Sequence, residues 1–135
     1  MQNKDILILY NEIIKNLHGD WLLVGGALLH VLEISDRVTL DIDLVPLGEI
    51  TNNDQLKIMQ IAEDNNFPPE TINFAAEFFV KKQKNWMDEI IILHENENLK
   101  LYRPSKKLFR LLKEQRGTET DLMDIEMFEK KITDR

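Results

Sequence analysis

Two aspartates separated by a single residue are the clearest chemical feature of the sequence. Asp41 and Asp43 flank Ile42 in a run where polar and apolar residues alternate. Residues two apart on a β-strand project from the same face, roughly 7 Å apart along the backbone, so both carboxylates can reach one or two divalent cations. Such oxygen ligands suit Mg²⁺ or Mn²⁺, and magnesium prefers a few carboxylates together with phosphate oxygens and water. An exposed polar strand face would give the same pattern, so the pair alone does not establish a metal site.

A pair of glycines lies upstream, where a phosphate could approach the backbone. Gly25 and Gly26 follow the apolar run 21–24 and precede a segment of helix-forming residues. Glycine in a strand-to-helix turn lets backbone N–H groups come close to an anion, although any tight turn of this kind favours glycine. Arg37 and Thr39 share the expected strand face of the two aspartates. Together the glycine turn, the two acids and the arginine indicate a metal-dependent phosphate site.

The elements that must position these residues follow from the spacing of apolar side chains. Helices are predicted over 4–17, 27–32, 51–65, 70–80 and 105–116, with a last one after Thr120, and strands over 21–24, 37–45, 89–93 and 99–102. In the strand 37–45, Leu40, Ile42 and Leu44 are expected to be buried, with the aspartates on the opposite, accessible face. The order of elements predicts a single α+β (or α/β) domain over residues 1–135, with a small sheet of three to five strands flanked by helices.

Composition limits the classes of protein to which the chain can belong. Its 135 residues are 43% apolar, include no cysteine and have a net charge of −7. No apolar run approaches the ~20 residues of a membrane helix, and no signal peptide is evident, so we expect a cytoplasmic protein without membrane contact. The negative charge argues against broad, nonspecific binding to nucleic acid. Two local basic strips remain, at Lys81, Lys82 and Lys84 and at 103–116, and each could equally be a solvated surface.

At these motifs the sequence resembles a known family. The segment Val24-Gly25-Gly26, followed by Arg37-Val38-Thr39-Leu40-Asp41-Ile42-Asp43-Leu44, resembles the signature of small bacterial nucleotidyltransferase-like proteins. These belong to the polymerase-beta superfamily and include relatives of toxin and antitoxin nucleotidyltransferases. Leu111-Leu112-Lys113, followed by Asp121-Leu122-Met123-Asp124-Ile125, is similar to the late motif of the same family. The resemblance covers residues 21–45 and about 99–128.

The resemblance implies a nucleotidyltransferase fold with a mixed sheet, together with a reaction. The enzyme would move a nucleoside monophosphate from an NTP to a protein or RNA acceptor with Mg²⁺ (or Mn²⁺). The toxin and antitoxin relatives suggest a toxin–antitoxin system, with a small helical partner protein, as one setting for it. Gly25 and Gly26 would hold the nucleotide phosphates, Asp41 and Asp43 would ligate the metal, Lys113 would neutralise phosphate charge, Asp121 would act as a base or position a reactant, and Arg37 would support the phosphate site or the strand face. Lys113 and Asp121 are therefore predicted to reach the same cleft as the two aspartates.

Two departures from the family pattern leave a second function open. Many superfamily enzymes have a glycine-serine turn and a third acid on a later strand, whereas this chain has Gly-Gly and offers Asp88 as its third metal ligand. Without a third carboxylate, the chain would be a catalytically degenerate module that binds a nucleotide or a partner protein. Lys113 could also extend to solvent from an apolar helix stripe, and Asp121 could simply be an acid favoured at a helix N-terminus.

Overall fold

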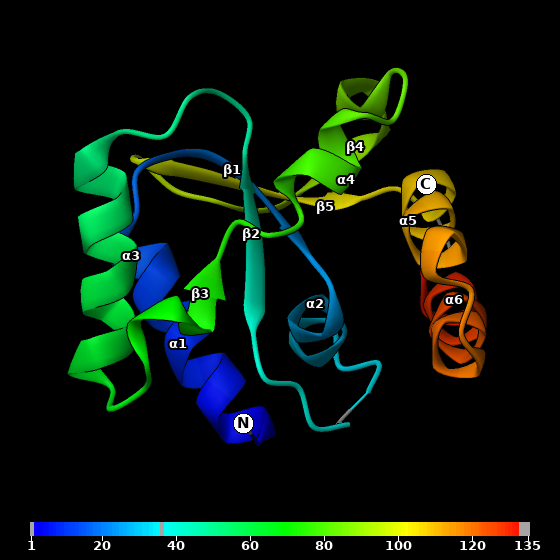
Figure 1. The fold of residues 1–135 in the computed structure, drawn as a ribbon, viewed down its shortest axis with the longest axis horizontal. Helices are drawn as coiled ribbons and strands as arrows, with labels where there is room; N and C mark the ends of the chain where they lie inside the picture. The colour runs from blue at the N-terminus through cyan, green and yellow to red at the C-terminus, as the bar shows by residue number, and fades with distance from the viewer. Residues whose placement is uncertain (1, 36, 133–135) are drawn as a thin grey trace.

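Five strands form one mixed sheet at the centre of the molecule (Figure 1). The computed structural model describes residues 2–35 and 37–132. The strands are β1 (Gly19–Val24), β2 (Ile42–Pro46), β3 (Ile72–Asn73), β4 (Ile90–Glu95) and β5 (Leu99–Pro104), in the order β3-β2-β1-β5-β4. Strand β1 is antiparallel to β2 and parallel to β5, β3 is parallel to β2, and β4 is antiparallel to β5. The fold is thus α+β, with a sheet of the expected size.

Helices flank this sheet on both faces and at one end. They are α1 (Asn3–Asn16), α2 (Gly26–Val31), α3 (Asn52–Asp64), α4 (Glu77–Lys81), α5 (Lys106–Arg116) and α6 (Glu119–Lys131), with short 3₁₀ turns η1 (Pro69–Thr71) and η2 (Trp86–Glu89). The hydroxyls of Thr51, Ser105 and Thr118 accept hydrogen bonds from the first-turn amides of α3, α5 and α6, which fixes where these helices begin. Gly117, at φ +65°, ends α5 as its sequence predicts.

Strand β1 is buried on both faces, which makes it a rigid support for the glycine turn that follows it. Trp21 and Leu23 belong to the main core with α1, α2 and α3, whereas Leu22 and Val24 belong to a smaller core on the other face with Val45 and Val80. Helices α5 and α6 join the main core through Phe109 and Phe128, whose rings stack with centroids 4.0 Å apart.

The strand predicted over 37–45 is shorter in the structure. Strand β2 begins at Ile42, where Ile42 and Leu44 are buried as expected, but Val38 and Leu40 are 68% and 76% exposed. The register explains the difference, because Asp43 pairs with Val24, the last residue of β1. Residues 37–41 extend past the end of β1, and no strand in the described part of the chain pairs with them. Asp41 consequently lies just outside the strand, while Asp43 lies within it.

The prediction of a helix over 70–80 is wrong for most of this segment. The segment forms η1, the two-residue strand β3 and a turn, and only Glu77–Lys81 is α-helical. The Asn73 side chain stabilises the turn, since its Nδ2 donates to Glu70 O at 3.1 Å and its Oδ1 accepts from Ala75 N at 3.0 Å. The last helix also begins earlier than expected, at Glu119, because Thr118 caps it.

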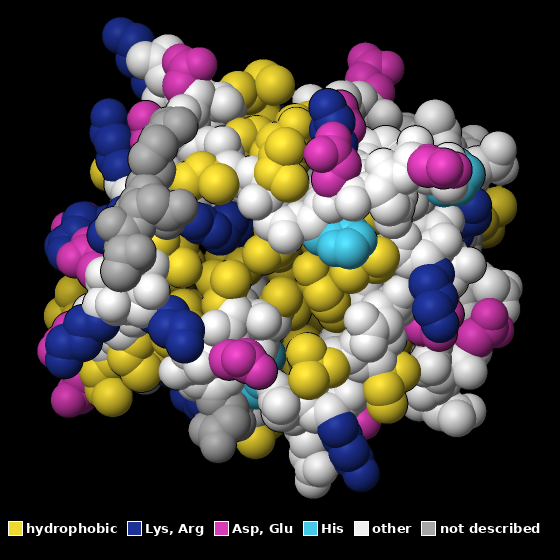
Figure 2. Space-filling view, turned by 180° about the vertical axis from the view of Figure 1, so that it is seen from behind, with side chains coloured by type: hydrophobic (Ala, Val, Ile, Leu, Met, Phe, Trp, Pro, Cys, Tyr) yellow, Lys and Arg dark blue, Asp and Glu magenta, His cyan; other side chains and the backbone are white. Residues whose placement is uncertain are grey.

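Hydrophobic side chains also reach the surface on the side opposite to the view of Figure 1. Figure 2 shows them gathered in the middle of that face, with charged side chains mainly toward its margin. Within the part of the chain that is described, no helix is both long and apolar enough to cross a membrane.

Candidate functional site

The carboxylate of Asp43 lies directly against the glycine turn. A Cβ atom added to Gly25 would come 2.3 Å from Asp43 Oδ2, closer than any real contact. Gly25 also has φ +78° and ψ −164°, a conformation that is essentially restricted to glycine. Next to it, a Cβ on Gly26 would lie 3.0 Å from Thr39 Oγ1. Gly25 and Asp43, which are 18 residues apart in the sequence, therefore lie in contact where β1 ends and β2 begins.

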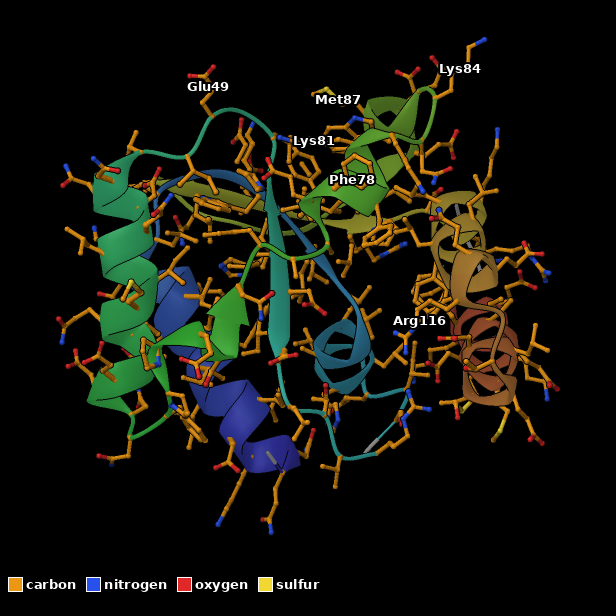
Figure 3. All side chains as sticks on the ribbon, viewed as in Figure 1. Glu49, Phe78, Lys81, Lys84, Met87 and Arg116 are labelled. Carbon is orange, nitrogen blue, oxygen red and sulfur yellow. The ribbon has the colours of Figure 1, made fainter. Side chains whose placement is uncertain are left out.

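A cavity of about 560 Å³ opens beside this contact. It lies at the carboxyl ends of the parallel strands β1 and β5, where α/β sheets commonly bind ligands, and its volume is in the range of small-molecule sites. Its lining comprises Val24, Gly25 and Asp43 at the ends of β1 and β2, Pro104, Phe109, Leu112, Lys113, Gln115 and Arg116 from β5 and α5, and Ala75, Ala76, Phe79, Val80 and Lys82 in and next to α4. Figure 3 shows Arg116 projecting from α5 toward the middle of the molecule.

An acidic side chain, Asp43, lies at one wall of this cavity, and two basic side chains, Lys113 and Arg116, lie at the facing wall. Burial, together with the negative charge of Asp41, raises the pKa of Asp43 to about 6, even though Lys113 and Arg116 act to lower it. The two aspartates thus repel each other, with one half-buried and the other exposed beside it. A bound cation would relieve this repulsion.

We expect Asp43→Asn to stabilise the protein at pH 7 when magnesium is absent. The pKa of Asp43 in the folded state, about 6, lies above its usual value of 3.8, so the stability that its protonated form contributes is lost as pH rises from about 4 to about 6. Asparagine avoids this loss, which corresponds to about 1–3 kcal/mol after allowance for partial solvent screening. Denaturant unfolding in the presence of a chelator should show the two proteins converging near pH 4 and diverging by pH 7.

Asp20→Asn provides the matched control for that measurement, because Asp20 is an exposed aspartate on the neighbouring strand β1. It should unfold like the wild type throughout this pH range. Equal stability of Asp43→Asn and the wild type at pH 7 would contradict the buried, repelled carboxylate.

Lys113 belongs to the cavity wall and also to a buried ion cluster. Its Nζ lies 3.0 Å from Asp124 Oδ2 and 3.7 Å from Asp121 Oδ1. The Arg37 Nη2 atom lies 2.8 Å from the same Asp124 Oδ2. Asp124 is completely buried, and its Oδ1 has no hydrogen-bond partner among the described residues. Asp124 therefore links α5, α6 and the loop before β2, although the sequence did not identify it as a site residue.

Arg37 and Asp121 lie elsewhere than predicted. Arg37 does not line the cavity, because its guanidinium binds Asp124 and attaches the loop before β2 to α6. Asp121 does not line it either, because its Oδ2 accepts hydrogen bonds from Thr118 N at 3.2 Å and Thr118 Oγ1 at 2.6 Å in the cap of α6. Burial acts to raise the pKa of Asp121, but these hydrogen bonds and the charges of Arg116 and Lys113 outweigh burial and lower it. Because its pKa is lowered, the Asp121 carboxylate is a poor general base at neutral pH.

The position beside Asp43 on the next strand is occupied by an amide. Asn73 on β3 is the register partner of Asp43, so the two side chains lie on the same face of the sheet, where a third carboxylate could join the first two. Asp88, the predicted third ligand, lies instead in η2, exposed and outside the cavity lining. Across the described ranges 2–35 and 37–132, no group of three or more His, Cys, Asp or Glu side chains could hold a metal ion.

Of the residues predicted from the sequence, Gly25, Asp43 and Lys113 line one cavity, and Asp41 lies beside it. Arg116, which the sequence suggested only as part of a basic strip, lines the cavity as well. No family model, curated protein or solved structure matches this chain. The family resemblance therefore rests on the sequence motifs alone.

Proposed function

We propose that the chain is a nucleotidyltransferase of the polymerase-beta type, which binds a magnesium-bound NTP in this cavity and transfers its nucleoside monophosphate to an acceptor. One observation carries the proposal: the carboxylate of Asp43 packs against Gly25 at one wall of a cavity whose facing wall carries Lys113 and Arg116. A metal–triphosphate complex needs both carboxylates for the cation and basic side chains for the remaining phosphate charge. The order β1, glycine turn, α2, β2 also agrees with a nucleotidyltransferase fold.

The donor atoms fit one magnesium ion. Asp41 and Asp43 would hold it, and phosphate oxygens and water would complete its coordination, as magnesium prefers. When bound, the ion would neutralise phosphate charge and polarise the phosphoryl group that is transferred. The raised pKa of Asp43 supports this assignment, because the folded chain carries an acidic pair that is destabilised without a cation.

The remaining lining residues would orient the nucleotide. Gly25, without a side chain, lets a phosphate approach the backbone beside Asp43. Lys113 is held by Asp124, so its positive charge is fixed at the wall, whereas Arg116 is exposed and can move toward a phosphate. Val80 on α4 and Leu112 on α5 offer an apolar surface for the base and limit water around it.

Magnesium together with an NTP should raise the melting temperature of the wild type, because a ligand that binds only the folded state stabilises it by mass action. At a hundredfold excess over the dissociation constant, the gain is about 2.7 kcal/mol. Asp41→Asn combined with Asp43→Asn should abolish this gain and leave the fold intact. A thermal shift series with Mg²⁺ and each of the four NTPs measures it, and the exposed pair Asp20→Asn with Asp64→Asn is the charge-matched control. A double variant at 41 and 43 that retains the full shift would place the site elsewhere.

The amide of Asn73, in the position where a third carboxylate could lie, favours a second candidate function, in which the chain binds the nucleotide without turnover. Two carboxylates and an amide hold a second metal poorly, and two-metal catalysis uses both ions to stabilise the attacking and leaving oxygens. Incubation with Mg²⁺ and each labelled NTP, with and without total RNA and cell lysate, separates the two functions. Label transfer with release of pyrophosphate supports the transferase. A thermal shift without any transfer supports the binding module.

A further inference from the structure

The segment 77–89, which comprises α4, the following turn and η2, presents two aromatic rings to solvent. We refer to this segment as the α4–η2 lobe, and Figure 3 shows it rising beside the sheet, with Phe78, Lys81, Lys84 and Met87 labelled on it. Phe78 is 70% exposed and Phe79 is 52% exposed, and their ring centroids lie 5.8 Å apart in an edge-on arrangement. Exposed aromatic side chains in contact with each other are typical of binding surfaces.

Lysines accompany these rings. Lys82 Nζ lies 5.7 Å from the centroid of Phe78 and 5.2 Å from that of Phe79. Lys84 is exposed at the end of the lobe, while Lys81 is paired with Glu77 at 2.8 Å. The lobe therefore combines aromatic rings with the exposed ammonium groups of Lys82 and Lys84.

The same lobe forms one rim of the candidate nucleotide cavity. Phe79 on α4 and Lys82 directly after it line this cavity, and Lys113 and Arg116 line it from α5. The rim is thus basic on two sides in a chain whose net charge is −7. A flat, anionic ligand that extends from the cavity across Phe78 would match both the rings and the charges.

We propose that the α4–η2 lobe binds a single-stranded nucleic acid and directs its terminal hydroxyl into the cavity as the acceptor. Bases would stack on Phe78 and Phe79, and backbone phosphates would lie near Lys82 and Lys84, which is how proteins bind single strands without reading their sequence. In a duplex the bases already stack on one another and cannot stack on these rings. An apolar protein segment would cover Phe78 but would leave the lysines without counter-charges, so it fits the lobe less well.

This inference rests on the proposed transferase function and names its acceptor. The oxygen of the terminal hydroxyl would form a bond to the α-phosphorus of the NTP, and the bond from that phosphorus to the bridging oxygen would break. Pyrophosphate would leave, and the hydroxyl proton would pass to water. The nucleic acid would end one nucleotide longer.

Fluorescence anisotropy with a labelled RNA of about ten nucleotides, measured at low salt without magnesium or NTP, tests the lobe directly. Phe78→Ala with Phe79→Ala should weaken binding by about tenfold or more, given the contribution of stacking to each base. Lys82→Gln with Lys84→Gln should also weaken binding and should lower its dependence on salt concentration. Leu56→Ala with Lys57→Gln, an exposed pair on α3, is the matched control and should bind like the wild type.

The outcomes separate this inference from the transferase proposal. Three results would overturn the inference, whatever the thermal shift with Mg²⁺ and NTP shows. The wild type could fail to bind the RNA, the lobe variants could bind it like the wild type, or a duplex could bind as tightly as the single strand. Binding that depends on the lobe in a protein without that thermal shift supports the lobe and overturns the transferase. Lys82 and Lys84 are both exposed, and a circular dichroism spectrum of their double variant identical to that of the wild type would exclude unfolding as the cause of weaker binding.

Discussion

Asp124→Ala is expected to lower the free energy of unfolding by about 3–5 kcal/mol, the range for removing one partner from a buried ion pair. Asp124 is completely buried and binds both Lys113 and Arg37 through its Oδ2. Without it, the buried ammonium of Lys113 would have to rely on the more distant Asp121 Oδ1, at 3.7 Å, among the carboxylates of the described residues. The loop that carries Arg37 would also lose its attachment to α6. Urea unfolding at pH 7, analysed by linear extrapolation, measures the change.

Glu129→Ala is the matched control, because Glu129 lies on the same helix in an ion pair of the same 2.8 Å length with Arg110. That pair is partly exposed, and its loss should cost about 1 kcal/mol or less. If the two variants lost similar free energies of unfolding, the buried Asp124 cluster would stabilise the protein no more than the partly exposed pair of Glu129 and Arg110. Lys113→Met combined with Asp124→Leu should recover part of the stability, because well-packed apolar residues can replace a buried ion pair.

The contact between the glycine turn and the acid could be predicted from the sequence, and the extent of the strand could not. Apolar alternation correctly placed Ile42 and Leu44 in the core and Asp43 on the opposite face. Alternation reports which face of a strand is apolar, but pairing also needs a neighbouring strand. Strand β1 ends opposite Asp43, so Leu40 is exposed although it continues the pattern.

The spacing of Asp124 within the last helix could have indicated from the sequence that this residue is buried. The buried residues of this helix are Asp121, Asp124, Ile125 and Phe128, which follow the helical spacing i, i+3, i+4, i+7. Two acids on a buried stripe need basic partners, and Lys113 and Arg37 supply them for Asp124. Asn73 gave no comparable signal, because a two-residue strand is too short to show a period.

Gly25→Ala should remove the response to Mg²⁺ and NTP altogether, which makes it the most direct test of the site. The added methyl would meet Asp43 Oδ2 at 2.3 Å, and φ of +78° with ψ of −164° is strained for alanine. The chain can relieve the contact only by moving the Asp43 carboxylate or the turn, and either movement displaces the atoms that would hold the metal and the phosphates. We expect a loss of about 1–3 kcal/mol in stability from backbone strain and no thermal shift with any NTP.

Gly117→Ala separates the effect of the site from the effect of the strain. Gly117 also has a positive φ, +65°, but a Cβ there would make only an ordinary contact, 3.4 Å from Glu114 O, and the residue does not line the cavity. Its replacement should cost about 1 kcal/mol in stability through the left-handed conformation alone, and should leave the shift with Mg²⁺ and NTP intact. If Gly25→Ala kept that shift as Gly117→Ala is expected to, the close approach of Gly25 and Asp43 would have no part in ligand binding. The nucleotide site would then have to be sought away from the ends of β1 and β2.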